Sequence, residues 1–275
     1  MQYVNRGLKG WKGALGVGVM ALAMLASVMV SEPAQADTLA EIEQRGTLRV
    51  AVPQDFPPFG SVGTTMQPRG YDIDMAQYLA DEMGVELELV TVTSANRIPY
   101  LQTRQVDLVI SSLGKNPERE AAIDFSDAYA PFFLGVFGTS QDEPLEAAEE
   151  LDGKTIGVTR GAVEDMELTE IAPQGTRIQR FEDNATTISA FLSGQVNYIA
   201  TGNLVAAEIA ERNSQRAPEL IYQLMDSPCH IGMNKGEPAL MEKVNELIAQ
   251  ALQDGTLEGM SQEWFHTGLP ENFGS

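Results

Sequence analysis

The stretch VDLVISSLGKNPERE, residues 106–120, combines the two kinds of element from which the fold is predicted. Its first five residues, VDLVI, form a short apolar run rich in β-branched side chains, which predicts a buried strand. Asn116 and Pro117 then predict a helix N-terminus, because asparagine can cap a helix and proline suits the first helical position. A strand that leads through a polar loop into a helix is typical of α/β folds.

Arg119 lies in the first turn of this expected helix, where the helix dipole favours acidic side chains. Its planar guanidinium could bind a carboxylate through two parallel hydrogen bonds. Ser111, Ser112 and Gly114 precede it, and their hydroxyl and N–H groups would suit an anion. The alternative is a surface arginine that pairs with Glu118 or Glu120, and the residues alone leave both interpretations open.

Strands and helices continue to alternate on both sides of this stretch. TLRVAV (47–52) and VELELVTV (85–92) predict strands that flank a helix at 71–83, whose apolar side chains recur on one face. An acidic segment at 140–153 interrupts the pattern. A second series of strands is then expected, at 154–159, 177–181 and 196–201. The sequence therefore predicts an α/β protein of two similar units with largely parallel sheets.

The first 36 residues differ from the rest of the chain. Arg6, Lys9 and Lys12 form a basic start, an uncharged run of 18 residues follows, and Ala34-Gln35-Ala36 offers a cleavage motif of small residues. This order predicts a cleavable secretory signal peptide at 1–36. An uncleaved membrane anchor is the alternative, since 18 residues are close to the minimum for a membrane-spanning helix.

Charge and cysteine content exclude several classes of protein. The whole chain has a net charge of −21, and residues 37–275 carry 15 basic and 38 acidic side chains, a net charge of −23. Such a surface repels nucleic acid and anionic membranes. The single cysteine, Cys229, permits no internal disulfide, and two histidines far apart give no metal-site spacing. No metal and no cofactor is expected.

Four loops follow the expected strands and would meet at one edge of each sheet. They are 53–60, 111–117, 160–163 and 201–203. Ligands of open α/β sheets bind beyond the carboxyl ends of the strands, so these loops form the candidate cleft. In the first loop, Phe56 and Phe59 could be core residues or an apolar wall for a ligand. Asp55 beside them could receive an ammonium group.

The chain resembles the family-3 periplasmic solute-binding proteins, which are polar amino-acid receptors of ABC transporters. Six stretches carry the resemblance, which covers essentially all of 37–267: TLRVAVPQDFPPFG, GYDIDMAQYLADEMGVELELV, TSANRIPYLQTRQVDLVISSLGKNPEREAAIDFSDAYAP, LDGKTIGVTRGA, FLSGQVNYIA and ALQDGTLEGMSQEWF. The resemblance implies a two-lobed clamshell with two inter-lobe crossovers. Lobe 1 is expected at 37–133 plus 231–275, lobe 2 at 137–227, and hinge crossovers at 134–136 and 228–230.

The resemblance also implies roles for individual residues. Arg119 would hold the ligand α-carboxylate, helped by Ser112, and Phe56 would lie against the ligand side chain. In receptors for acidic amino acids, the positions of Ser94 and Arg97 also touch the ligand. The full set of expected ligand-binding residues is Asp55, Phe56, Phe59, Ser94, Arg97, Ser112, Leu113, Gly114, Arg119, Val163 and Asn203.

The chain departs from the family pattern at several of these positions. Gly114 stands where many members have a serine or threonine that bonds the carboxylate. Ala162 and Val163 supply no hydroxyl groups. The usual aspartate for the ligand α-amino group aligns with Gly202, and Asn203 and Asp55 are its nearest polar substitutes. The identity of the amino acid or carboxylate therefore stays open, as does recognition of an α-amino group.

The resemblance implies a monomeric periplasmic receptor without catalysis that delivers a polar amino acid or related carboxylate to a membrane permease. The first alternative is an enzyme on the same clamshell, of the cyclohexadienyl dehydratase type. An enzyme would need a positioned acid or base, for which Asp55, Glu164 and Asp165 are the candidates. A second alternative, a sensor module, is less favoured because the sequence shows no attached domain or second apolar segment.

Overall fold

The computed structural model describes residues 37–63 and 66–274, so the signal peptide expected at 1–36 lies outside the described residues. These described residues form one compact unit. No helix within the described ranges is long and apolar enough to cross a membrane.

The first of two large sheets has the strand order β5-β1-β6-β13-β7. Its strands are β1 (Thr47–Val52), β5 (Glu86–Thr91), β6 (Leu108–Leu113), β7 (Asp124–Ala130) and β13 (Cys229–Met233). β1 pairs in parallel with β5 and β6, whereas β13 is antiparallel to β6 and β7. The helices joined to this sheet are α1 (Thr38–Arg45), α2 (Tyr71–Met83), α3 (Arg97–Gln102), α4 (Pro117–Ala122), α8 (Pro238–Gln253) and α9 (Thr256–Phe265).

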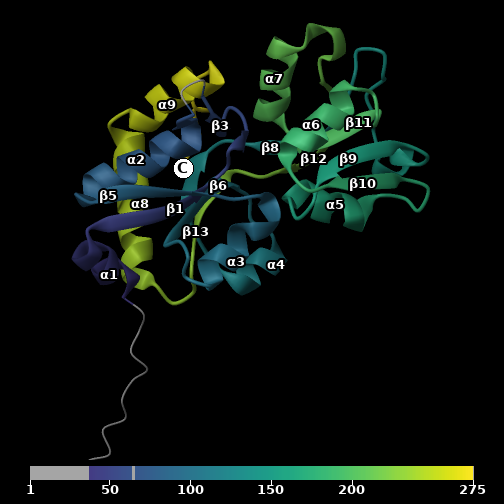
Figure 1. Ribbon diagram of the computed structural model, residues 1–275. Coiled ribbons are helices and arrows are strands. Elements are labelled where there is room, and N and C mark those ends of the chain that lie inside the picture. The colour runs from purple at the N-terminus through teal and green to yellow at the C-terminus, as the bar shows by residue number, and fades with distance from the viewer. Residues whose placement is uncertain (1–36, 64–65, 275) are drawn as a thin grey trace, which may run out of the picture. The chain divides into compact units, whose positions relative to one another are not determined.

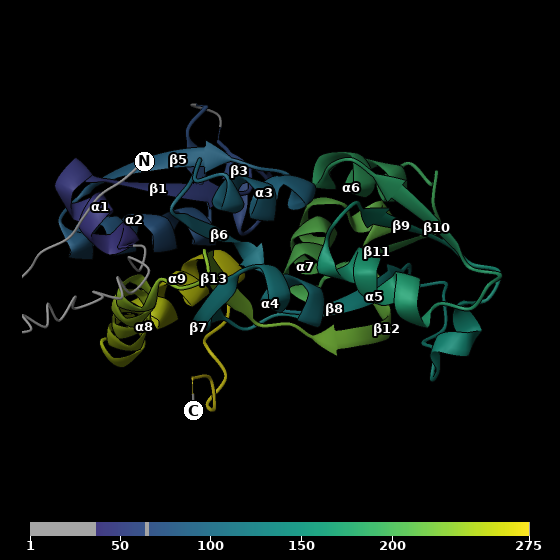
Figure 2. The ribbon, with the colours of Figure 1, turned by 90° about the horizontal axis from the view of Figure 1, so that it is seen from below.

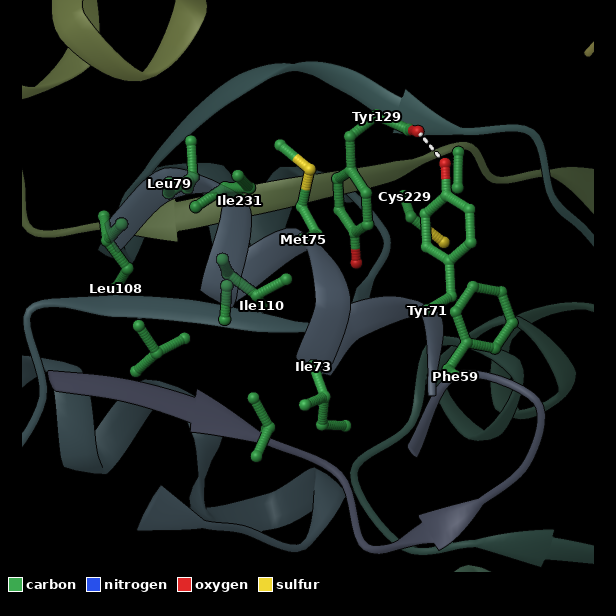
Figure 3. Close-up of a cluster of buried hydrophobic side chains, with 14 of the residues drawn as sticks. Phe59, Tyr71, Ile73, Met75, Leu79, Leu108, Ile110, Tyr129, Cys229 and Ile231 are labelled. Carbon is green, nitrogen blue, oxygen red and sulfur yellow. Dashed lines mark hydrogen bonds between the residues drawn. The ribbon is translucent and has the colours of Figure 1, made fainter. Parts of the chain in front are cut away.

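Alternate residues of each strand point to opposite faces of the first sheet. Both faces are buried, because a separate apolar core covers each of them. Val50 and Ile110 point into the larger core, which contains the apolar faces of α2 and α8. Ala51 and Val109 point into a smaller core under α3. Figure 3 shows the larger core, where the Tyr71 hydroxyl donates a hydrogen bond of 2.7 Å to the carbonyl of Tyr129.

The second large sheet has the strand order β10-β9-β11-β8-β12. Its strands are β8 (Phe133–Gly138), β9 (Thr155–Thr159), β10 (Arg177–Phe181), β11 (Tyr198–Gly202) and β12 (Glu219–Asp226), and its helices are α5 (Val163–Ile171), α6 (Asn184–Leu192) and α7 (Asn203–Arg212). β9 is parallel to β10 and β11, while β8 is antiparallel to β11 and β12. Figure 1 shows these strands and helices in teal and green.

Several short elements complete the described fold. A small antiparallel sheet is made by β2 (Asp55–Phe56), β3 (Gly60–Val62) and β4 (Pro68–Arg69). The loop expected at 53–60 therefore contains β2 and the start of β3. These short strands were missed because the prolines and the glycine of this segment predict a loop. Three 3₁₀ turns are η1 (Ser94–Asn96), η2 (Ala148–Leu151) and η3 (Ser214–Arg216).

The chain changes from one large sheet to the other at two places. It leaves the first sheet after Ala130 and enters the second at Phe133, and it returns between Asp226 and Cys229. The hinge expected at 134–136 therefore lies inside β8, and the one expected at 228–230 overlaps the start of β13. The Ser227 N–H donates to the Phe132 carbonyl (2.9 Å), which ties the two crossover segments together. Figure 2 shows both crossovers leading from the first sheet toward β8 and β12.

Candidate ligand-binding pocket

A small pocket lies beside the two crossovers, and side chains from both large sheets line it. Its lining residues are Phe56, Ser94, Arg97, Ser112, Gly114, Phe132, Leu134, Ala162, Val163, Glu164, Asn184 and Ser227. Seven of the expected residues take part: Phe56, Ser94, Arg97, Ser112, Gly114 and Val163 line the pocket, and Arg119 contacts one of its walls at Gly114.

Arg97 is the most unusual group in this pocket. It opens α3, only 5% of its surface is exposed, and its Nε finds no hydrogen-bond partner in the described part of the chain. Burial lowers the pKa of the Arg97 guanidinium, while Glu164 and Asp72 oppose that change. A buried cation without a hydrogen-bonded partner is costly, so this arrangement suits a pocket that receives an anion.

Ser112 lies beside Arg97 with a strained backbone. Its φ of 41° is in the left-handed region that non-glycine residues rarely adopt. The Ser112 N–H donates to Asp72 Oδ2 (2.8 Å), and the Tyr129 hydroxyl donates to Asp72 Oδ1 (2.5 Å). The Ser112 hydroxyl is buried and has no partner among the described residues. Asp72 thus holds the backbone in a conformation that leaves the hydroxyl free for a ligand.

Asp72 is fully buried beneath this site. Burial raises the pKa of its carboxyl to about 7, although the bonds from Tyr129 and Ser112 and the charge of Arg97 all act to lower it. The burial cost is larger because the low-dielectric core disfavours the carboxylate. Asp72 therefore does not fully neutralise Arg97 near neutral pH.

Arg119 has partners of its own. Only 3% of its surface is exposed, which contradicts the alternative of a surface arginine paired with Glu118 or Glu120. Its Nη1 donates to the carbonyl of Gly114 and its Nη2 to the carbonyl of Gly161, both at 2.9 Å. Burial and the charge of Arg97 lower its pKa to about 10.

These bonds join a loop of the first sheet to the loop that precedes α5 in the second. A guanidinium has five N–H donors, so Arg119 keeps donors for a ligand after making both bonds. Because α4 has only six residues, Arg119 lies in its last turn as well as its first, and the helix dipole does not disfavour it.

Glu164 supplies the acidic group of the pocket. It lies in the first turn of α5 and is buried. Burial raises the pKa of its carboxyl, and Arg97 and Arg119 act in the opposite direction. Its neighbour Asp165 instead pairs with Arg180, with 2.7 Å between the Arg180 Nε and Asp165 Oδ1. Of the acids considered for catalysis, Glu164 is thus the one that faces the pocket.

Asp55 does not line the pocket. Its carboxylate accepts hydrogen bonds from the Asn184 N–H (2.9 Å), the Asn184 side-chain amide (3.1 Å) and the Ala185 N–H (3.1 Å). These groups form the N-terminus of α6, where unpaired N–H groups and the helix dipole favour an anion. Asp55 therefore connects the small sheet with the second large sheet, and its oxygens are already occupied by three donors.

The two glycines that depart from the family pattern have close neighbours. A Cβ atom at Gly202 would overlap the Phe132 ring, so the ring fills the space in which a side chain at 202 would stand. A Cβ atom at Gly114 would overlap the hydroxyl of Ser227. In both cases, a crossover residue occupies the space that the glycine leaves.

Three further expected residues lie outside the pocket. Phe59 is a core residue whose ring is 5.0 Å from Phe132 and 6.3 Å from Tyr71, measured between ring centroids. Leu113 packs into the smaller core of the first sheet. The Asn203 Oδ1 accepts a hydrogen bond of 3.1 Å from the Phe133 N–H at the start of β8.

The expected ligand-binding residues did not include the lining residues Phe132, Leu134, Asn184 and Ser227. Phe132, Leu134 and Ser227 lie at or next to the crossovers, and only the return of the chain between the sheets brings them to the pocket. The short polar segment DSP at 226–228, between two apolar strands, is the one signal that could have drawn attention to Ser227. The described residues form no cluster of histidine, cysteine and acidic side chains suited to a metal ion.

Comparison with known proteins agrees with this architecture. The chain is 27% identical over 250 residues to the L-cystine-binding protein TcyJ of Escherichia coli (strain K12), covering 90% of this chain and 94% of that protein. It is 28% identical over 244 residues to the ABC transporter glutamine-binding protein GlnH of Bacillus subtilis (strain 168), covering 85% and 86% of the two chains.

Solved structures show the same fold. The ancestral amino acid-binding protein AncCDT-1, a precursor of cyclohexadienyl dehydratase, matches with a TM-score of 0.76 and 32% identity, covering 83% of this chain and all of the other. A solute receptor for L-cysteine of Neisseria gonorrhoeae matches with a TM-score of 0.75 and 28% identity, covering 82% and 92%. These neighbours confirm the expected two-lobed α/β fold. The profile of the bacterial extracellular solute-binding proteins, family 3, matches residues 48–267, and the chain belongs to that family.

Proposed function

We propose that the protein binds a small polar amino acid, or a related small carboxylate, in the pocket beside the crossovers. The observation that carries this proposal is Arg97, a buried guanidinium whose Nε has no partner in the described residues. The free hydroxyl of Ser112 in the same pocket supports it, because a carboxylate accepts several hydrogen bonds at once.

The charges of the pocket favour a ligand with no net positive charge. Arg97 and Arg119 are cations at or beside the pocket, and Glu164 is the one acidic residue among its lining side chains. A carboxylate would neutralise one guanidinium, and Glu164 could receive an ammonium group in place of the absent side chain at 202. A zwitterion such as cystine, cysteine or glutamine fits this balance better than arginine does.

The transport role follows from the family and its relatives, several of which are named as binding proteins of ABC transporters. We propose that a permease recognises the closed form, and that the protein is a periplasmic monomer after removal of residues 1–36. The two large sheets would be the cores of the lobes, with hinges at 131–132 and 227–228. A ligand that touches both lobes stabilises the closed state, because only that state makes all contacts.

Calorimetric titration of the purified protein tests the proposal. The panel holds cystine, cysteine, glutamine, glutamate and arginine, together with a dicarboxylate such as succinate. We expect micromolar or tighter binding of a zwitterionic or anionic member, and weak or absent binding of arginine. If no amino acid or carboxylate binds, or if arginine binds best, the proposed ligand class is wrong.

A second candidate function, dehydration of a cyclohexadienyl acid, is favoured by one observation. Glu164 is a buried carboxyl beside two guanidinium groups in the pocket, where an acid could act on a bound substrate. This observation does not require catalysis, because a single acidic side chain such as Glu164 can also bind a ligand without a positioned base beside it. Incubation with prephenate tests this candidate: we expect no aromatic product, and a product that disappears in Glu164→Gln would establish the enzyme instead.

A further inference from the structure

The second crossover, residues 227–228, brings Ser227 into the wall of the pocket. The residue is buried, with 4% of its surface exposed. Its N–H donates to the Phe132 carbonyl (2.9 Å), so its backbone is held by the first crossover. Ser227 lines the pocket, and its hydroxyl lies against Gly114.

The position of this hydroxyl is defined by Gly114. A Cβ atom built on Gly114 would overlap the Ser227 Oγ and lie 3.3 Å from a methyl carbon of Val163. The hydroxyl therefore occupies the space of a side chain at 114, between the loop after β6 and the start of α5. The Gly114 carbonyl accepts a hydrogen bond from Arg119, so the hydroxyl lies next to an arginine-bearing wall.

Two neighbouring groups of the pocket lack partners. Ser112 Oγ and Arg97 Nε are buried and unpaired among the described residues, and both belong to residues that line this pocket. A carboxylate has two oxygens that can accept about four hydrogen bonds. Ser227 would add a third donor, because it lines the same pocket.

We propose that Ser227 is a ligand-binding residue, whose hydroxyl donates a hydrogen bond to the anionic group of the ligand in place of a side chain at 114. This inference rests on the proposed function. Because Ser227 lies where the chain passes between the sheets, its bond to the ligand acts directly on the hinge. Changes in the backbone torsions at Ser227 would move the sheets relative to each other and would also move the Ser227 hydroxyl.

A reciprocal exchange of the hydroxyl tests the inference. Ser227→Ala should bind the ligand about tenfold more weakly, the loss expected for one hydrogen bond to a charged group. Gly114→Ser alone should also weaken binding, because its side chain meets the Ser227 hydroxyl. The double variant Gly114→Ser/Ser227→Gly returns one hydroxyl to the same space, and its affinity should lie within about threefold of the wild type. The φ of Gly114 lies outside the left-handed region, so serine fits its backbone.

Ser61→Ala is the matched control, since Ser61 lies in β3 and does not line the pocket. This variant should bind the ligand with the affinity of the wild type. Thermal unfolding without ligand reports that each variant is folded. If the wild type binds a ligand and Ser227→Ala binds it equally well, the inference is overturned while the proposed function stands. A double variant no tighter than Ser227→Ala also overturns it. If the wild type binds no member of the panel, the proposed function itself fails.

Discussion

Two buried arginines, Arg97 and Arg119, lie close together and differ in one respect. Arg119 has its terminal nitrogens on two carbonyl groups, one before α4 and one before α5, whereas Arg97 Nε has no partner in the residues described. Burial lowers the pKa of both guanidinium groups, so burial does not distinguish them. From this difference in hydrogen bonding we propose that Arg119 mainly holds the contact between the sheets and that Arg97 binds the ligand.

Ionisation of Asp72, the buried acid beneath Arg97, gives the largest expected effect on the free energy of unfolding. Its pKa is raised to about 7, so the folded protein keeps this proton up to neutral pH, while the unfolded chain loses it near pH 4. The stabilisation is complete below pH 4 and is lost as the pH rises toward 7. Three pKa units correspond to ~4 kcal/mol in the free energy of unfolding.

Urea unfolding of the wild type and Asp72→Asn between pH 4 and 8 measures this effect. We expect the wild type to lose stability relative to the variant over pH 4–7 and to run parallel to it above pH 7. Parallel curves over the whole range would show that Asp72 is ionised in the folded protein, and Arg97 would then have an ion-pair partner.

The variant Arg97→Met tests the role proposed for Arg97 in this comparison. Loss of one partner of a buried charged pair typically costs 2–5 kcal/mol, so the ligand affinity should fall by a factor of about 30 or more. Without ligand the unfolding temperature should stay the same or rise, because methionine removes an unpaired buried cation and keeps the volume. Calorimetry and thermal unfolding check both, with Arg160→Met as the control, since Arg160 is exposed and pairs with Glu182.

The matched variant Arg119→Met should have the opposite effect on stability. It leaves the carbonyls of Gly114 and Gly161 without their donor, which should lower the free energy of unfolding by about 2 kcal/mol. The unfolding temperature of the protein without ligand is the measurement. A larger loss of stability in Arg97→Met than in Arg119→Met would reverse the roles that the structure gives these residues.

The elements with a strong local pattern were predicted well from the sequence. The helix expected at 71–83 is α2 with the same limits, and the strand expected at 177–181 is β10. β12 was missed, because its pairing with β8 contains two register shifts and its burial does not alternate regularly. The expected limits of β6 were short by three residues at its end, since Ser111 and Ser112 are polar but buried.

The site was predicted in part. Ser94, Arg97, Ser112 and Gly114 were expected and line the pocket, because the resemblance extends to their positions. Asp55 was expected near an ammonium group, yet it accepts hydrogen bonds from the N-terminus of α6, and no local pattern reveals a partner 129 residues away. Phe132 and Ser227 were missed because each fills the space beside a glycine from the other part of the chain. Such complementarity exists only after the chain has crossed between the sheets twice.

A crystal structure of the protein with its bound ligand tests the central claim most directly. We predict that the ligand carboxylate lies within about 3.2 Å of Arg97 Nε and of the Ser112 hydroxyl, while Arg119 keeps its bonds to the carbonyls of Gly114 and Gly161. A ligand bound elsewhere, or a carboxylate that bonds Arg119 while Arg97 stays unpaired, would contradict the account.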